Sequence, residues 1–276
     1  MSPTDQNEKL VFLDGELVSE VCAGASAVSG SVLYGKGVFT TIALCGGEPF
    51  EWARHAKRLA KNSHILGLEI GPSAIEELLG SLRDLAARNE SGEGKARITI
   101  FDPSAPELWG GGPARPCSVM IQTSERRPAQ DPLSVAVSPF LLNSASPLAG
   151  LKTCNYLEPL LAKEEAFRRG FGEAVRLNEK GFVAGCCLAN LFWVSRAGGA
   201  LRTPALSTGC LPGTIREYIL ERTDVEEAEI GLDELRADAE AMFVTSAVRG
   251  ISPVFEVEGF ERLSPVRETA TSIVPY

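Results

Sequence analysis

The hydrophobic positions of this chain repeat with two periods, and the first is that of a β-strand. "KLVFLDGELV" (9–18) places two short apolar stretches around Asp14-Gly15, which is the pattern of a β-hairpin. "VFTTIAL" (38–44) is rich in β-branched residues and lies between glycines, and Gly46-Gly47 predicts a second hairpin turn after it. Two further strands are predicted at "KARITIF" (95–101) and "CSVMIQT" (117–123).

The second period is helical and separates these strands. "EWARHAKRLAKNSHILGL" (51–68) repeats its apolar residues every three to four positions, with lysines and arginines on the opposite face. The predicted apolar face consists of Trp52, His55, Leu59 and Ile65-Leu66. "SAIEELLGSLRDLAARN" (73–89) is a second amphipathic segment, in which Ser73 is the expected N-cap.

A polar stretch with two prolines, "SERRPAQDP" (124–132), is the predicted linker between two domains. Residues 1–125 are expected to form a small α+β domain, and residues 133–276 a larger one that also contains Lys152. In the second domain the pattern predicts a strand at 133–140, then a helix within 155–171 that ends at Gly170, and then strands within 173–185. It further predicts a hairpin at 190–204, a helix at 214–222 and a closing strand pair at 241–257.

Charge and composition exclude several classes of function. The chain has 276 residues, a net charge of −9 and a pI near 5.0, whereas nucleic-acid proteins need clustered lysine and arginine. Seven cysteines without a CxxC pair, together with only two histidines, predict no metal site and a reducing compartment. The polar start and the lack of a long apolar run predict a soluble, cytoplasmic protein.

Small residues gather unusually in "GFVAGCCLANLFW" (181–193), which has the rhythm of a strand, a tight turn and a second strand. Its centre holds Gly185, Cys186, Cys187 and Asn190. Small side chains at the crossing point of two strands leave room for a flat ligand. The stretch contains no charged residue to hold such a ligand.

Three other motifs suggest chemistry. Lys152 lies between apolar neighbours in "LAGLKTCNYL", and a buried lysine has a depressed pKa and attacks carbonyl groups readily. "STGCLPGTIRE" opens directly into a helix, whose free N–H groups suit a phosphate. In "HAKRL", Arg58 lies one turn from His55 and could serve as a phosphate-binding fork. Each motif alone also fits a plain structural interpretation: a surface lysine, an ordinary helix start and a solvated arginine.

In their order and spacing, these motifs resemble those of the class IV aminotransferases, the fold-type IV enzymes that use pyridoxal 5′-phosphate (PLP). The matching stretches are "YGKGVFTT", "HAKRL", "KTCNYL", "GCCLANLF", a "TP" at 203 and "LPGTIR". The family includes branched-chain and D-amino-acid aminotransferases and aminodeoxychorismate lyase. The resemblance implies a two-domain fold like that of D-amino-acid aminotransferase, with a small α/β domain, a larger β-barrel-like domain and the cofactor in the cleft between them. It also implies a homodimer and a small amino substrate.

The resemblance also implies roles for individual residues. Lys152 corresponds to the cofactor-bound lysine, which also shuttles a proton. Tyr156 corresponds to the residue near the phenolic oxygen, and Asn190 to one that holds the turn under the ring, where Gly185, Cys186 and Cys187 lie. The residues implied around the phosphate are Arg58, the backbone of Thr214 and Ile215, and Ser246.

The chain departs from the family at the position five residues before Asn190, where the family has a glutamate that pairs with the pyridine nitrogen. That position is Gly185 here, and several family arginines are also replaced. "GCCLANLFW", "GVFTT" and "SPLAGLK" resemble the lyase, which removes pyruvate from aminodeoxychorismate to give 4-aminobenzoate for folate. Three hypotheses remain open: a lyase, an amino-acid aminotransferase, and a catalytically degenerate scaffold.

Overall fold

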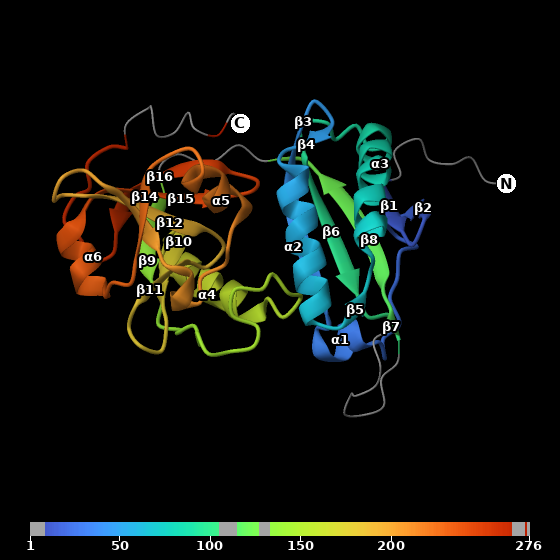
Figure 1. The fold of residues 1–276 in the computed structure, drawn as a ribbon, viewed down its shortest axis with the longest axis horizontal. Helices are drawn as coiled ribbons and strands as arrows, with labels where there is room; N and C mark the ends of the chain where they lie inside the picture. The colour runs from blue at the N-terminus through green and yellow to red at the C-terminus, as the bar shows by residue number, and fades with distance from the viewer. Residues whose placement is uncertain (1–8, 105–114, 127–132, 267–273, 275–276) are drawn as a thin grey trace. The chain divides into compact units, whose positions relative to one another are not determined.

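The computed structural model describes residues 9–104, 115–126, 133–266 and 274, and Figure 1 draws their fold. Contacts divide the chain into two compact units. The first contains residues 1–127 and 152–155, and the second contains 128–151 and 156–276. Residues 127–132 of the predicted linker lie outside the described part. No helix of the described residues is both long and apolar enough to cross a membrane.

The first unit is built on an antiparallel six-stranded sheet with the order β2-β1-β8-β6-β3-β4. Its strands are β1 (Leu10–Leu13), β2 (Glu16–Ser19), β3 (Gly37–Cys45), β4 (Glu48–Pro49), β6 (Lys95–Phe101) and β8 (Ser118–Ser124). The predicted hairpin turns between β1 and β2 and between β3 and β4 are both present. At the first turn, Asp14 (φ 50°) and Gly15 (φ 101°) adopt the left-handed backbone that such two-residue turns require. Short strands β5 (Leu68–Glu69) and β7 (Arg115–Pro116) pair in parallel.

Two helices, α2 (Trp52–Ile65) and α3 (Pro72–Arg88), cover one face of this sheet (Figure 1). The predicted face of α2 is largely confirmed, because Trp52, His55 and Leu59 are buried. Ile65 was placed on that face but is 51% exposed, because the helical turn carries it away from the stripe of buried residues. Ser73 is not the N-cap of α3: Gly71 caps the helix and Pro72 starts it, because proline suits the first helical position.

The short helix α1 (Gly30–Tyr34) was not expected from the sequence pattern. Ser29 caps it by accepting a hydrogen bond from the Val32 amide, and Gly35 (φ 62°) ends it. Its five residues are too few for a periodic pattern to identify. Only Gly35 and Lys36 separate it from β3.

The second unit is built on a mixed, curled eight-stranded sheet with the order β11-β10-β9-β16-β15-β12-β13-β14. Its strands are β9 (Leu133–Val137), β10 (Glu173–Leu177), β11 (Val183–Cys186), β12 (Asn190–Ser195), β13 (Leu201–Pro204), β14 (Val225–Ala228), β15 (Ala239–Ser246) and β16 (Gly250–Val257). Its helices are α4 (Leu157–Arg168), α5 (Thr214–Leu220), α6 (Leu232–Asp238) and the 3-10 turn η1 (Leu206–Thr208). β14 and α6 were not expected from the sequence.

The strands at the small-residue stretch do not form a ladder with one another. β11 pairs with β10 and β12 pairs with β15, although the Cys186 amide donates to the Ala189 carbonyl across the turn between them (2.9 Å). The prediction of two strands around a tight turn is thus confirmed. The hairpin predicted at 190–204 is formed by β12 and β13, while β11 pairs with β10.

Residues 152–155 contact the first unit, whereas the sequence analysis placed Lys152 in the second. The Phe39 amide donates to the Lys152 carbonyl (3.0 Å), and the Cys154 amide donates to the Gly37 carbonyl (2.8 Å). Val38 and Thr153 form an antiparallel bridge between these two bonds. The lysine segment is therefore attached to β3, and local sequence patterns carry no information about such a long-range pairing.

Candidate active site

Lys152 has the properties of a reactive amine. Its side chain is partly buried, and its Nζ lies 4.5 Å from the centre of the Phe39 ring. Burial, followed by the nearby positive charges of Arg58 and Arg97, lowers the pKa of Lys152 from 10.5 to about 7. A large fraction of the amine is therefore neutral at physiological pH. Only the neutral amine can attack a carbonyl carbon.

Arg58 is fixed by a buried polar relay within the first unit. Its Nη2 donates to Thr40 Oγ1 (2.7 Å), and Thr40 Oγ1 lies 2.6 Å from His55 Nδ1. Because arginine can only donate, the Thr40 oxygen accepts from Arg58, and the direction of the Thr40–His55 bond depends on the tautomer of the histidine. Burial, followed by Arg58 and Lys152, lowers the pKa of His55 well below its usual value, so the ring is neutral. The relay orients the guanidinium and involves no net charge on the histidine.

Arg97 is a second cation beside Lys152, and the sequence analysis did not single it out. It lies on β6, with its guanidinium carbon 3.7 Å from the Phe39 ring centre. Phe39 thus lies near both cations, and its ring favours positive charge on its faces. No sequence signal distinguishes Arg97 from other strand arginines. Its register opposite Thr41 of β3 is what brings it to Lys152.

In the second unit, Asn190 and the start of α5 form a second polar group. Asn190 Nδ2 donates to the carbonyl of Leu211 (2.8 Å), two residues before Gly213, the N-cap of the helix. A Cβ at Gly213 would lie 1.9 Å from Asn190 Oδ1, so any other residue there would displace the Asn190 amide. Thr214 and Ile215 are buried at the first positions of α5.

Two buried hydroxyls in this group have no hydrogen-bond partner among the described residues. These are the Oγ1 atoms of Thr214 and Thr245. Thr245 pairs directly with Asn190 across β12 and β15. A buried hydroxyl without a partner is costly and calls for an explanation such as a bound ligand. The sequence analysis had named Thr214 but missed Thr245.

The other predicted site residues of the second unit vary in what surrounds them. Ser246 Oγ accepts a hydrogen bond from the Arg249 amide (3.3 Å), in the turn between β15 and β16. Tyr156 is partly buried and lies at the N-cap position of α4.

The two adjacent cysteines of the small-residue stretch are both shielded from water. Burial raises the pKa of Cys186 well above its usual value, and burial with Glu173 nearby raises the pKa of Cys187 to about 12. Both thiols therefore stay protonated and are not nucleophiles.

Gly185 has a backbone that other residues rarely adopt, with φ at 128°. An added Cβ would meet only the Ala189 carbonyl, at 3.4 Å. There is space for a side chain, but the conformation opposes one. The backbone conformation at Gly185 therefore disfavours the glutamate that the resemblance to the family implies at this position.

Comparisons with known proteins show the family to which the chain belongs. The sequence model of the family "Amino-transferase class IV" matches residues 37–257. A protein of Methanocaldococcus jannaschii described as a branched-chain-amino-acid aminotransferase is 30% identical over 90% of this chain and 88% of its own length. The aminodeoxychorismate lyase of Bacillus subtilis is also 30% identical, over 90% of this chain and 87% of its own.

Solved structures share the whole fold. The branched-chain aminotransferase of Thermoproteus uzoniensis with norvaline superposes with a TM-score of 0.86, at 28% identity over 96% of this chain and 92% of its own. A T.th. branched-chain aminotransferase with pyridoxamine 5′-phosphate gives 0.86 at 23% identity, with the same coverage of both chains. The two-domain α+β fold of a fold-type IV enzyme is therefore confirmed, and the chain belongs to the class IV aminotransferase family, whose cofactor is pyridoxal 5′-phosphate.

Proposed function

We propose that this protein is a PLP-dependent enzyme acting on a small amino substrate, with Lys152 as the residue that holds the cofactor. One observation carries the proposal: the Lys152 amine has a pKa of about 7 beside an arginine that is fixed by its own relay. A lysine of this kind has little structural use, because burying an amine next to two cations destabilises the fold.

The donor set fits this cofactor. Lys152 offers a neutral amine to the aldehyde, and Arg58 offers a planar guanidinium to the phosphate. The hydroxyl of Thr214, which has no hydrogen-bond partner in the described part of the chain, and the first amides of α5 are further donors suited to phosphate oxygens. When bound, PLP withdraws electrons from the α-carbon of an amino substrate.

Several of the chain's residues then have roles around that α-carbon. Lys152, with a pKa near neutrality, can accept a proton at Nζ and return it. Burial, followed by the charges of Arg58 and Arg97, lowers the pKa of this amine and so favours release of the proton. Tyr156 is proposed to lie near the phenolic oxygen. Asn190, Gly185, Cys186, Ile215 and Ser246 complete the proposed set of cofactor-binding residues.

Within this family, we propose the reaction of a 4-amino-4-deoxychorismate lyase, in which 4-amino-4-deoxychorismate is cleaved to pyruvate and 4-aminobenzoate. The sequence supports this through "GCCLANLFW" and "GVFTT". The structure adds that Thr40, which stands where aminotransferases of the family carry glutamate, is the acceptor for Arg58. The relatives named above support the lyase and an aminotransferase equally in identity.

Transamination of a branched-chain or D-amino acid is the second candidate, and a direct assay separates the two. The PLP-loaded protein is incubated with 4-amino-4-deoxychorismate, and pyruvate and 4-aminobenzoate are measured. In parallel it is incubated with single amino acids, and conversion to their 2-oxo acids is measured. We expect the wild-type protein to form pyruvate and 4-aminobenzoate in equal amounts. Lys152→Ala is expected to form neither product. Turnover of amino acids alone would identify an aminotransferase, and no turnover in either assay would favour a degenerate scaffold.

A further inference from the structure

A buried arginine stands directly across the strand from Gly185. β10 and β11 are antiparallel, and Arg176 pairs with Gly185 in their register. Directly opposed residues send their side chains to the same face of a sheet, about 5 Å apart. Arg176 is only 4% exposed. Arg176 therefore emerges on the side of the sheet to which a side chain at 185 would project, and none of its atoms lies within 4 Å of a Cβ added there.

Arg176 is held in place by the chain that follows β9. Its Nη2 donates to the Leu141 carbonyl (3.0 Å) and its Nε to the Phe140 carbonyl (3.4 Å). Nη2 also pairs with Glu158, near the start of α4. Glu158 is 61% exposed at its side chain, so water weakens this pairing. None of the hydrogen bonds found among the described residues uses Arg176 Nη1.

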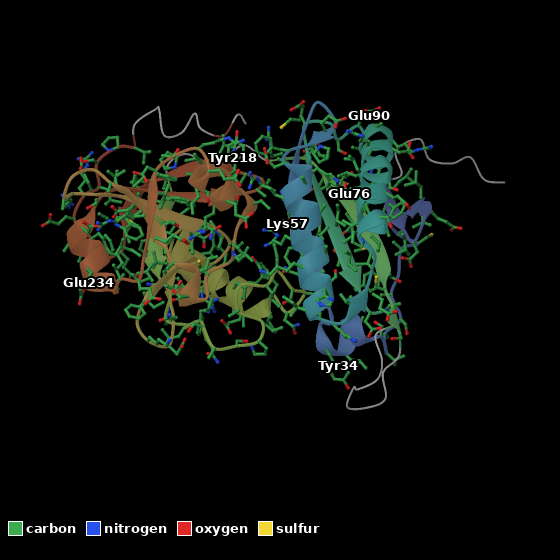
Figure 2. All side chains as sticks on the ribbon, in the orientation of Figure 1. Tyr34, Lys57, Glu76, Glu90, Tyr218 and Glu234 are labelled. Atoms are coloured by element: carbon green, nitrogen blue, oxygen red, sulfur yellow. The ribbon has the colours of Figure 1, made fainter. Side chains whose placement is uncertain are left out.

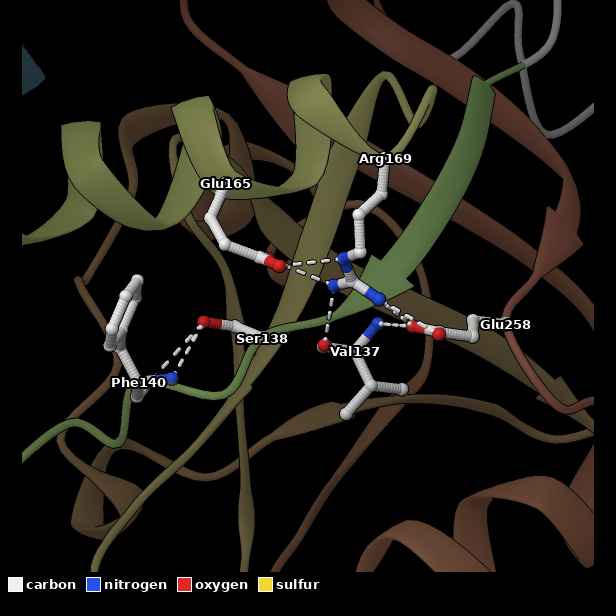
Figure 3. Close-up of polar contacts among 6 residues, drawn as sticks. All are labelled: Val137, Ser138, Phe140, Glu165, Arg169 and Glu258. Carbon is white, nitrogen blue, oxygen red and sulfur yellow. Dashed lines mark hydrogen bonds and ion pairs between the residues drawn. The ribbon is translucent and has the colours of Figure 1, made fainter.

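The acceptor segment of Arg176 is itself braced (Figure 3). The Phe140 amide donates to Ser138 Oγ (3.1 Å), which closes the turn after β9. Arg169 Nη2 donates to the Val137 carbonyl (3.0 Å), and the Val137 amide donates to Glu258 (2.9 Å). Arg176 is therefore anchored to a fixed backbone and keeps its position without a ligand.

Glu173, a buried carboxylate of the same strand, already has its own partners. Glu173, on the same strand as Arg176, accepts from the amides of Ala174 (3.0 Å) and Cys187 (3.1 Å) and lies 3.6 Å from Lys163 Nζ. It is buried among these partners. It therefore does not replace the carboxylate that is missing at Gly185.

We propose that Arg176 takes the place of the missing carboxylate and faces the ring nitrogen of bound PLP, so that this nitrogen carries no proton. This inference rests on the proposed function. A guanidinium donates but never accepts a hydrogen bond, so it binds the lone pair of an unprotonated pyridine nitrogen and repels a pyridinium. The ring is then a weaker electron sink, and half-transamination of amino acids is slow.

The test is ¹⁵N NMR of PLP labelled at the ring nitrogen, bound to the apoprotein and titrated with pH. We expect wild type to show an unprotonated ring nitrogen at neutral pH. In Arg176→Gln, the protonation midpoint of this nitrogen is expected to rise by about 1–3 pH units, the usual effect of removing one adjacent charge. Arg176→Lys keeps the charge and is expected to stay close to wild type. Arg202→Gln is the matched control, because it removes a β13 arginine that pairs with Glu226 of β14. It is expected to leave the midpoint unchanged.

A protonated ring nitrogen in wild type at neutral pH would overturn the proposal, even if Arg176→Gln did not fold. An equal midpoint in wild type and a folded Arg176→Gln would overturn it as well. If PLP did not bind to the protein at all, the proposed function would fail instead. Binding to Lys152 with a protonated ring nitrogen would leave the proposed function intact and remove only the role of Arg176.

Discussion

At the scale of single residues, the proposed chemistry depends on Lys152, whose pKa is lowered by burial and by two neighbouring arginines. The sequence could indicate Lys152, because apolar neighbours flank it, and Arg58, because it follows His55 by three positions. It could not indicate Arg97 or Thr245. Their importance comes from strand register, which places Arg97 near Lys152 and Thr245 opposite Asn190. Arg176 was missed for the same reason.

The depressed pKa of Lys152 makes the stability of the apoprotein depend on pH. Below pH 7 the amine is charged in both folded and unfolded states, so the full cost of burying it opposes folding. Between pH 7 and 10.5 only the unfolded state holds the proton, and wild-type stability rises by up to about 1.4 kcal/mol per pH unit. Lys152→Met removes the buried charge and is expected to be more stable than wild type below pH 7, with a difference that shrinks toward pH 10.5.

Urea unfolding of both apoproteins at several pH values measures this difference. Lys57→Met, at an exposed position of α2 (Figure 2), is the matched control and is expected to follow the wild-type curve. A constant difference between wild type and Lys152→Met across this pH range would contradict the depressed pKa.

The relay behind Arg58 gives a second prediction. Thr40→Val removes the hydroxyl between Arg58 and His55 while nearly keeping the volume. It leaves buried polar groups unsatisfied, so we expect a loss of about 1–3 kcal/mol in stability and weaker binding of PLP. Thr40→Ser keeps the hydroxyl and is expected to retain most of both. Equal PLP affinities of Thr40→Val and wild type in an absorbance titration would show that the relay does not support the phosphate site.

At the scale of elements, periodicity predicted the hairpins and the long helices well. Periodicity did not predict features that depend on a single residue, on a very short element or on pairing between distant segments. Pro72 moved the start of α3, and the five residues of α1 were too few to show a period. Residues 152–155 paired with β3, which lies far away in the sequence.

Gly185 offers a test at this scale. Its φ of 128° should make Gly185→Ala destabilising by about 1–2 kcal/mol, and Gly185→Glu at least as much. Gly80→Ala, inside α3 with open space around the new methyl group, is the matched control and is expected to stabilise by about 0.5–1 kcal/mol. Thermal unfolding of the three variants compares them. If Gly185→Ala were as stable as wild type, the left-handed conformation would not restrict this position.

At the scale of the whole molecule, we expect a homodimer. α1 exposes Val32 (56%), Leu33 (51%) and Tyr34 (44%), and Tyr34 is labelled in Figure 2. Neighbouring exposed apolar side chains of this kind are typical of a contact surface. Light scattering at micromolar concentration should give twice the chain mass, and Leu33→Glu should reduce it. A wild-type monomer under these conditions would contradict the expectation.

The most direct test of the central claim is to find where PLP attaches. The protein is incubated with PLP and reduced with borohydride, which fixes the bond between an amine and the cofactor's carbonyl carbon, and its peptides are analysed by mass spectrometry. We predict that the phosphopyridoxyl group is found on Lys152, at one per chain, and that Lys152→Ala carries none. Modification spread over surface lysines, or no modification of Lys152 at saturating PLP, would contradict the account.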